Sequence, residues 1–324
     1  MKWNAFSVFE DVFANTKSLI MPFSFKKWLK LGFIGWMSDF SSSGGGSGNT
    51  NFNPGSSNPQ GMKATGNFIK ELGLPPGIAY LILGLIGIFL IIALLFSYLK
   101  GVFTFIFLNA LEKKDMQIIK NYKKYHHQGI SFFMFKIVYS VITILLLVAI
   151  ASPFIYNIIS NWSSIMVDPA SVFSGINPII TVLVIFLFIL YFLALGIFWS
   201  FVMNFSVIHM YFKKENFTKS FTKTLFKLKN QKKEFLLFLL ARIVISIIVS
   251  ILMVLSIIIL LIPFLIIGFI FFIPVFFFPL FIPISIIVAI LLFIIFLLCC
   301  IVILAPFLTF KTYHSLACYK KFMK

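Results

Sequence analysis

The hydrophobic and polar positions of this chain form long blocks and not short alternations. A transmembrane helix needs about 20 apolar residues, and four blocks reach that length. They are Gly77–Tyr98 with a continuation to Leu111, Ser131–Asn157, Ile179–Tyr211 and Phe235–Phe310. The last block contains one charged residue, Arg242, and is long enough that it must cross a membrane more than once.

Prolines mark the places where this last block can be interrupted, because proline lacks an amide donor and clashes with the preceding helical turn. These are Pro263, Pro274, Pro279 and Pro283. We predict two full helices, Phe235–Ile262 and Ile284–Phe310. Between them, Phe264–Ile282 is expected to be a re-entrant, kinked or extracytoplasmic interfacial segment. The alternative is a seventh span, which would place the C-terminal tail outside.

The N-terminal region combines amphipathic and short apolar segments. Trp3–Ile20 has Phe6, Phe9, Phe13 and Ile20 on one side of a helix, and KKWLKLGFIGWMSDF (Lys26–Phe40) is short for a span. Ser41–Gly61 has no charge and is rich in Gly, Ser, Asn and Pro, a composition typical of a flexible loop.

The distribution of lysines predicts the orientation of the helices. The formal net charge is +18, and lysines concentrate in Lys100–Lys136, Phe212–Phe235 and Lys311–Lys324. Ile158–Pro178, between the first two, contains Asp168 and no cation. By the positive-inside rule, the lysine-rich parts are cytoplasmic and Ile158–Pro178 is external. Placing both termini inside requires six crossings, with Lys26–Phe40 as a short crossing helix.

Composition restricts the class of protein. Sixty per cent of residues are hydrophobic and 11% are charged, and mean hydropathy is +1.05, whereas a soluble domain is about a quarter charged. We therefore predict an all-α, polytopic integral membrane bundle of about six crossings with amphipathic interfacial helices. Its predicted parts are residues 1–40 (interfacial plus short membrane helix), 41–76 (Gly/Ser loop), 77–310 (bundle) and 311–324 (basic cytoplasmic tail), in a single membrane domain. Three cysteines do not form a disulfide framework.

Both lysine-rich loops are predicted to form basic amphipathic helices on the membrane surface. Ile118, Ile119, Tyr122 and Tyr125 share one helical face, opposite several lysines. Phe217, Phe221, Leu225 and Leu228 do the same in the second loop. Such helices bind anionic inner-leaflet lipid, the predicted partner. The candidate headgroup or anion contacts are Lys136, Arg242, Lys123, Lys124, Lys223 and Lys227.

Two membrane-embedded residues allow alternative interpretations. Arg242 is either an anion or headgroup ligand or a side chain that snorkels to the interface, and Lys136 in an equivalent place favours snorkelling. His209 is either a proton-relay residue or an ordinary interfacial histidine, and the absence of an embedded carboxylate favours the latter.

No recognisable motif indicates catalysis. The chain has no Walker, GxSxG or HExxH motif, and its nine acidic residues form no catalytic pair. We predict no catalytic residue, metal or cofactor, and no nucleic-acid partner, because the membrane explains the lysines better.

Four segments resemble an uncharacterised family of prokaryotic, mainly archaeal, multi-pass membrane proteins with a glycine-rich loop after a PF-x(4)-WLKLG motif. They are Pro22–Trp36, Ala110–Lys136, Asn204–Val244 and Leu304–Phe322. A more distant likeness is to the six-span membrane domain found beside bacterial glycerophosphodiester phosphodiesterases. That likeness favours six crossings and implies no catalytic residue in this chain. At Lys27 and Lys136 the chain has lysine where family members have arginine, which weakens bidentate anion binding there.

Together these features predict a non-enzymatic protein of a prokaryotic cytoplasmic membrane, acting in membrane organisation or as an accessory to a membrane protein partner. The alternative is a transporter or lipid-handling protein. In that alternative, the broken segment Pro263–Pro283 lines the pathway, and its four prolines form the gate.

Overall fold

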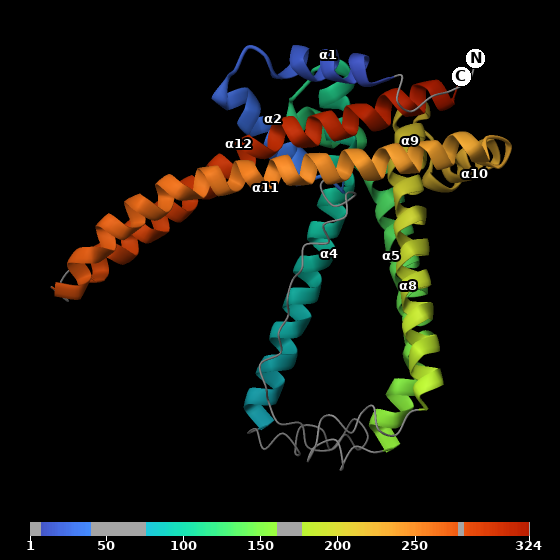
Figure 1. Ribbon diagram of the computed structural model, residues 1–324, viewed down its shortest axis with the longest axis horizontal. Helices are drawn as coiled ribbons and strands as arrows, with labels where there is room; N and C mark the ends of the chain where they lie inside the picture. Colours follow the sequence, from blue (N-terminus) through green and yellow to red (C-terminus); the bar gives the residue numbers. More distant parts are fainter. Residues whose placement is uncertain (1–7, 40–75, 161–176, 278–281, 324) are drawn as a thin grey trace. The chain divides into compact units, whose positions relative to one another are not determined.

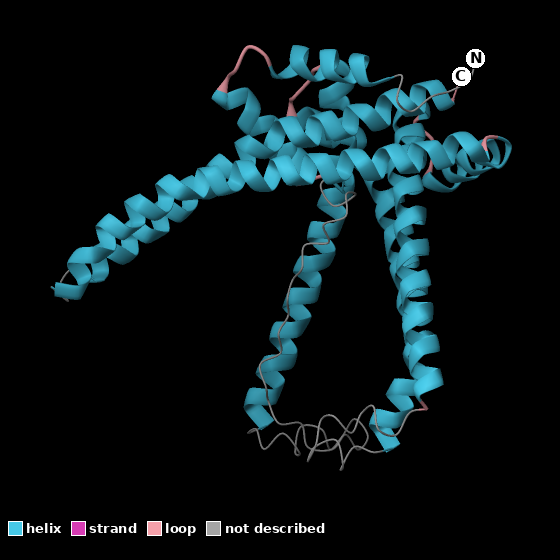
Figure 2. Cartoon of the chain, in the orientation of Figure 1, coloured by secondary structure: helices cyan, strands magenta, loops and turns pink. Residues whose placement is uncertain are grey.

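The computed structural model describes residues 8–39, 76–160, 177–277 and 282–323. Within these ranges the chain forms helices and short connections (Figures 1 and 2). The helices are α1 (Phe9–Ile20), α2 (Phe25–Trp36), α4 (Pro76–Lys113), α5 (Ile118–Ser160), α8 (Pro178–Phe201), a π-helical turn η3 (Val202–Ser206), α9 (Val207–Lys213), α10 (Phe217–Asn230), α11 (Lys232–Phe277) and α12 (Ile282–Phe322).

Five helices of the described ranges are long and apolar enough to cross a membrane. They cover Tyr80–Lys113, Ile118–Ser160, Pro178–Lys213, Lys232–Ile273 and Ile282–Phe322. The predicted all-α membrane bundle is confirmed. The sixth predicted crossing, Lys26–Phe40, corresponds to α2, whose 12 residues extend only about 18 Å, less than the roughly 30 Å of a bilayer core.

The predicted irregular segment after Pro263 is helical as far as Phe277. Helix α11 passes without interruption through Pro263 and Pro274, so the helix is not broken at these prolines, whereas a kinked or extracytoplasmic position of residues 264–277 stays a prediction. A proline inside a helix frees about one backbone hydrogen bond. Ending the helix in lipid would leave several backbone groups without partners, so the continuous helix costs less. Pro279 lies outside the described residues, and Pro283 lies at the start of α12.

Two further segments belong to longer helices than the sequence indicated. The first lysine-rich loop forms the beginning of α5 and not a separate surface helix. The predicted tail after Lys311 continues α12 to Phe322, with most of its residues buried. Only the second loop forms a separate amphipathic helix, α10, which buries Phe217, Ser220 and Thr224.

The described chain divides into two compact units, and α4, α5 and the α8 helix contribute to both. Unit 1 comprises Met1–Ser47, Leu99–Phe132 and Trp199–Lys324. Unit 2 comprises Gly48–Tyr98 and Phe133–Phe198.

In unit 1, α12 is the central helix and contacts α2, α11, α1 and η3. Figure 1 shows α11 and α12 side by side as an antiparallel pair. Phe264 packs on Phe296 in that pair, with ring centroids 5.3 Å apart. Close packing of α2 depends on Gly32, since a Cβ there would lie 2.0 Å from the Ile301 carbonyl oxygen.

Helix α1 packs on α12 through a face that matches the predicted one only in part. It buries Val12, Thr16, Leu19 and Ile20, whereas Phe13 of the predicted face is exposed, and Phe6 lies outside the described residues. Phe9 contacts the rings of Phe310 and His314. The exposed phenylalanine suits lipid, which can cover an apolar face that no helix covers.

In unit 2, the helices are joined mainly by aromatic packing and two hydrogen bonds between helices. Tyr139 stacks on Phe198, with ring centroids 5.1 Å apart. The Tyr191 hydroxyl donates to the Thr143 carbonyl at 2.6 Å, and Lys136 Nζ donates to the Ser97 carbonyl at 2.8 Å. Most apolar side chains of these helices are exposed, for example Ile91 and Leu145, as expected for surfaces that face lipid.

Candidate functional site: a lysine-lined pocket and a buried arginine

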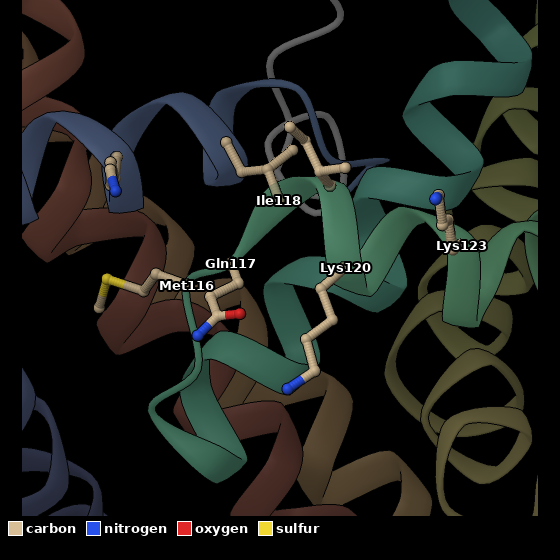
Figure 3. Close-up of a pocket in the computed structure, with 7 residues that line it drawn as sticks. Met116, Gln117, Ile118, Lys120 and Lys123 are labelled. Carbon is tan, nitrogen blue, oxygen red and sulfur yellow. The ribbon is translucent and has the colours of Figure 1, made fainter.

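A pocket of about 750 Å³ lies within unit 1 between α2 and the start of α5. Lys30 of α2 and two lysines of α5, Lys120 and Lys123, contribute its charge. The remaining lining residues are Met116, Gln117, Ile118 and Ile119. Figure 3 shows Met116 and Gln117 leading into α5, with Lys120 and Lys123 on its first turns. The pocket therefore combines three cations with apolar side chains.

The turn before α5 holds the pocket in place. Helix α4 ends where Lys114 adopts a left-handed conformation with φ 56°. Asp115 then accepts a hydrogen bond from the Gln117 backbone N–H at 3.1 Å. This bond is the largest cause of the lowered pKa of Asp115, and nearby lysines add to it. Asp115 is therefore ionised at neutral pH and stabilises the helix start.

The neighbouring predicted lysine, Lys124, has a different environment. Its ammonium group lies 4.9 Å from the centroid of the Tyr125 ring, a cation–π contact. Tyr125 itself is buried and donates to Asn109 Oδ1 at 2.8 Å. Lys123 is therefore part of the pocket, whereas Lys124 packs on the helix beside it.

A second polar region of unit 1 lies in its interior, where α11, α12 and η3 meet. Arg242 is 4% exposed, and its Nη1 donates to the Lys311 carbonyl at 2.6 Å. Among the residues that the structure describes, the Nε and Nη2 atoms have no hydrogen-bond partner. Arg242 does not snorkel to the surface, so the favoured interpretation of this residue was wrong. The packed end of α12 encloses its side chain instead.

A chain of hydrogen bonds extends from Lys311 to η3. Ser315 Oγ donates to Asn204 Oδ1 at 2.6 Å and lies 3.3 Å from the Lys311 carbonyl. Asn204 Nδ2 donates to the Ser200 carbonyl at 2.6 Å. Asn204 lies in the π-helical turn, and such turns frequently occur at functional sites.

His209 belongs to the same interior region. Its Nδ1 lies 2.8 Å from the Tyr319 hydroxyl, while its Nε2 is buried without a partner. Both residues are buried in protein, so His209 is not an interfacial histidine facing headgroups. Whether it relays protons remains an open prediction.

The structure distributes the predicted contact residues over several places. Lys123 lies in the pocket and Arg242 in the interior of unit 1. Lys136 belongs to unit 2, where it bonds a backbone carbonyl. On α10, Lys223 pairs with Glu215, whereas Lys227 is half-buried.

Sequence reasoning missed four residues. Lys30 and Lys311 were part of the general lysine excess, Lys120 was one of the lysines on the predicted amphipathic helix, and Asn204 was assigned no role of its own. Lys30 and Lys120 are far apart in the sequence and meet only through folding. Lys311 is the first charged residue after 68 uncharged ones. This position at the end of a long apolar run is a signal that could have identified it.

The chain belongs to a family of unknown function, DUF7544, whose model matches residues 3–323. No curated protein and no solved structure matches the chain. Within the described residues, no group of three or more His, Cys, Asp or Glu side chains is arranged to hold a metal ion.

Proposed function

We propose that this protein is a non-enzymatic membrane protein that binds anionic phospholipid headgroups at its lysine-rich end. In this role it organises the membrane or supports a membrane protein partner. The observation that carries the proposal is the pocket formed by Lys30, Lys120 and Lys123.

The pocket suits a phospholipid in both charge and polarity. Three lysines line the pocket, and each lysine near an anionic surface contributes about 1 kcal/mol. Ile119 is 78% exposed beside them, so an apolar side chain is available for an acyl chain or glycerol backbone. An anionic lipid satisfies both features, whereas a soluble polyanion would leave Ile119 in water.

We further propose that the lysine-bearing ends of the five long helices lie on the cytoplasmic side of a prokaryotic cytoplasmic membrane, with both termini. The lysine-bearing ends of all five long helices belong to unit 1, which the positive-inside rule assigns to the inside. Phe9 contacts His314 in the same unit, which supports placing the two termini together. Five crossing helices would leave the two termini on opposite sides of the membrane. Placing both termini inside therefore requires one further crossing between α1 and α4.

Lipid binding is tested with a charge-matched pair of triple variants in nanodiscs. Replacing Lys30, Lys120 and Lys123 with glutamine should weaken binding of phosphatidylglycerol about 100-fold, from about 1 kcal/mol for each lysine. Replacing Lys219, Lys229 and Lys233, which are exposed elsewhere in unit 1, removes the same charge and serves as the control. Equal losses in both variants would show diffuse charge attraction without a pocket and would refute the proposed site.

Orientation is tested by labelling an introduced cysteine. Cys318 is fully buried and is unsuitable, so Lys223→Cys on exposed α10 is introduced after the native cysteines are replaced with serine. A membrane-impermeant maleimide should label it only in permeabilised cells. Labelling in intact cells would place the lysine-bearing helix ends outside.

A lipid-handling role is the second candidate, favoured by an apolar groove of about 540 Å³ in unit 1. Phe13, Ile20 and Trp28 line it from the N-terminal helices, and Leu252 and Phe307 line it from α11 and α12. The unbroken α11 removes the reason for a pathway at its prolines. Leu252→Trp fills the groove. If the protein transfers lipid between vesicles and this variant abolishes the transfer, the result would support this role. Unchanged transfer would count against it.

A further inference from the structure

We propose that Arg242 and Lys311 form an internal binding site for a phosphate group, carried by a phospholipid or free in solution. The site lies where α11 meets α12 and includes no residue of the lysine-lined pocket. It goes beyond the proposed function, since either site can exist without the other.

The first observation is the edge of the Arg242 guanidinium group that is formed by Nε and Nη2. Nη1 is occupied by the Lys311 carbonyl, whereas Nε and Nη2 have no partner. The N–H bonds of Nε and Nη2 point in the same direction from one edge of the planar guanidinium. This edge matches two oxygens of a single oxyanion, which arginine binds through two parallel hydrogen bonds.

The second observation is the charge around this edge. Lys311 is 6% exposed, and its backbone carbonyl accepts the hydrogen bond from Arg242, so a second basic residue is buried next to the arginine. Among the described residues, no carboxylate forms an ion pair with either. Buried charges are normally paired, because leaving them without a counter-charge is costly. An anion between the two side chains offsets both charges.

The surrounding polar groups hold the arginine in position. Arg242 donates to the Lys311 carbonyl, and Ser315 and Asn204 connect this carbonyl to the π-helical turn. Pre-positioned donors of this kind bind a ligand without a large ordering cost.

Phosphate is the oxyanion that fits two cations best. A phosphate group carries one to two negative charges and has enough oxygens for the arginine edge and the lysine ammonium together. Chloride has one centre and cannot occupy both donors of the edge in the same way.

The test uses full-length protein in detergent, extensively delipidated, in phosphate-free buffer. Melting temperature is followed while inorganic phosphate or dioctanoyl phosphatidic acid is added, with chloride at matched ionic strength as control. We expect phosphate or the lipid, but not chloride, to raise the melting temperature, because a ligand that binds only the folded state stabilises it. A response to the lipid alone identifies a headgroup site, and a response to phosphate identifies a free-anion site.

Three variants relate the response to the two side chains. Arg242→Lys keeps the charge but loses the paired donors, and should raise the apparent Kd about 30-fold, within the range for a charge-assisted hydrogen bond. Arg242→Met and Lys311→Met should abolish the response. Arg242→Met should also melt at a higher temperature than the wild type in ligand-free buffer, because it removes a buried unpaired charge, and so it distinguishes lost binding from lost folding.

Several outcomes would overturn the proposal. Chloride acting as well as phosphate would indicate an adventitious ion only, and an unchanged Kd in Arg242→Lys would exclude the paired contact. Glu71 and Asp168 lie outside the described residues, so their neutral variants test whether the chain supplies a carboxylate. If Glu71→Gln or Asp168→Asn destabilises the wild type but not Arg242→Met, the chain itself supplies the counter-charge.

Discussion

The helices of the two units are held together in different ways. In unit 1, polar bonds connect distant helices: Arg242 to Lys311, Ser315 to Asn204, and the Tyr313 hydroxyl to the Leu111 carbonyl at 2.7 Å. In unit 2, a comparable bond joins Tyr191 to Thr143, but most apolar side chains around it are exposed.

Glycines show the same difference in packing. In unit 1, a Cβ on Gly32 or Gly129 would lie within 2.4 Å of a neighbouring helix. In unit 2, a Cβ on Gly84, Gly87 or Gly196 would meet nothing within 4 Å. Small residues that allow backbones to approach are a main determinant of helix association in membranes. Only unit 1 uses them in this way among the described glycines.

This contrast indicates where specific function lies. Lipid is as apolar as leucine, so burying apolar surface gives little preference for one helix arrangement over another. Close approach and polar bonds do give such a preference, and they are concentrated in unit 1. The lysine-lined pocket and Arg242 also lie there, so the best-defined packing and the candidate sites coincide.

The largest effect is expected for Gly32→Leu. Its side chain would overlap the Ile301 carbonyl and force α2 away from α12, with a loss of about 3 kcal/mol or more. Gly268→Leu on α11, where nothing lies within 4 Å of an added Cβ, is the matched control and should be nearly neutral. Melting temperatures in detergent measure both. Similar losses at both positions would remove the packing distinction.

Asn204→Leu should have the next largest effect. It removes the acceptor of Ser315 and leaves a buried hydroxyl with a poorer partner, at a cost of about 1–3 kcal/mol. Thr143→Val, whose hydroxyl bonds only within its own helix in unit 2, should change stability little. Urea or thermal unfolding compares them, and an equally large effect of Thr143→Val would contradict the comparison.

The tyrosine hydroxyls allow a direct comparison of one bond in each unit. Tyr313→Phe and Tyr191→Phe each remove one bond to a backbone carbonyl. Tyr313 is 8% exposed and leaves a buried carbonyl, so we expect a loss of about 1 kcal/mol. For Tyr191, about 0.6 kcal/mol is expected, as for other membrane hydrogen bonds. A reversed order, measured by unfolding, would show that the polar bonds of unit 1 are not the stronger ones.

The smallest effect concerns the surface pair of Glu215 and Lys223. The hydrogen bond from Lys223 lowers the pKa of Glu215. A lowered folded-state pKa gives stability that is present above the ordinary carboxyl pKa and disappears as pH falls through the lowered value. Glu215→Gln should therefore melt slightly below the wild type at pH 7 and equal it at strongly acidic pH. A difference that is independent of pH would exclude ionisation as its cause.

Several parts of the fold could be predicted because each depends on one segment alone. Long apolar runs must be helical in lipid, since no water is present to satisfy the backbone. The starts of α4, α8 and α11 accordingly lie near the predicted ones, whereas α11 continues past its predicted end at Ile262 to Phe277. Which apolar residues of α1 are buried could not be predicted. Phe13 and Val12 are both apolar, and only the neighbouring helix determines which of the two is buried.

The sequence by itself determined the class of protein, the helical segments and the gathering of lysines at one end of them. These follow from hydrophobicity, backbone hydrogen bonding and charge, all of which are local. Only the tertiary structure decided that Lys30 and Lys120 line the same pocket and that α12 continues through the predicted tail. It also decided that Arg242 is buried with its Nε and Nη2 atoms unpaired among the described residues. The reason is physical: a lysine or arginine near the end of an apolar run has the same local sequence whether it reaches the interface or is covered by another helix.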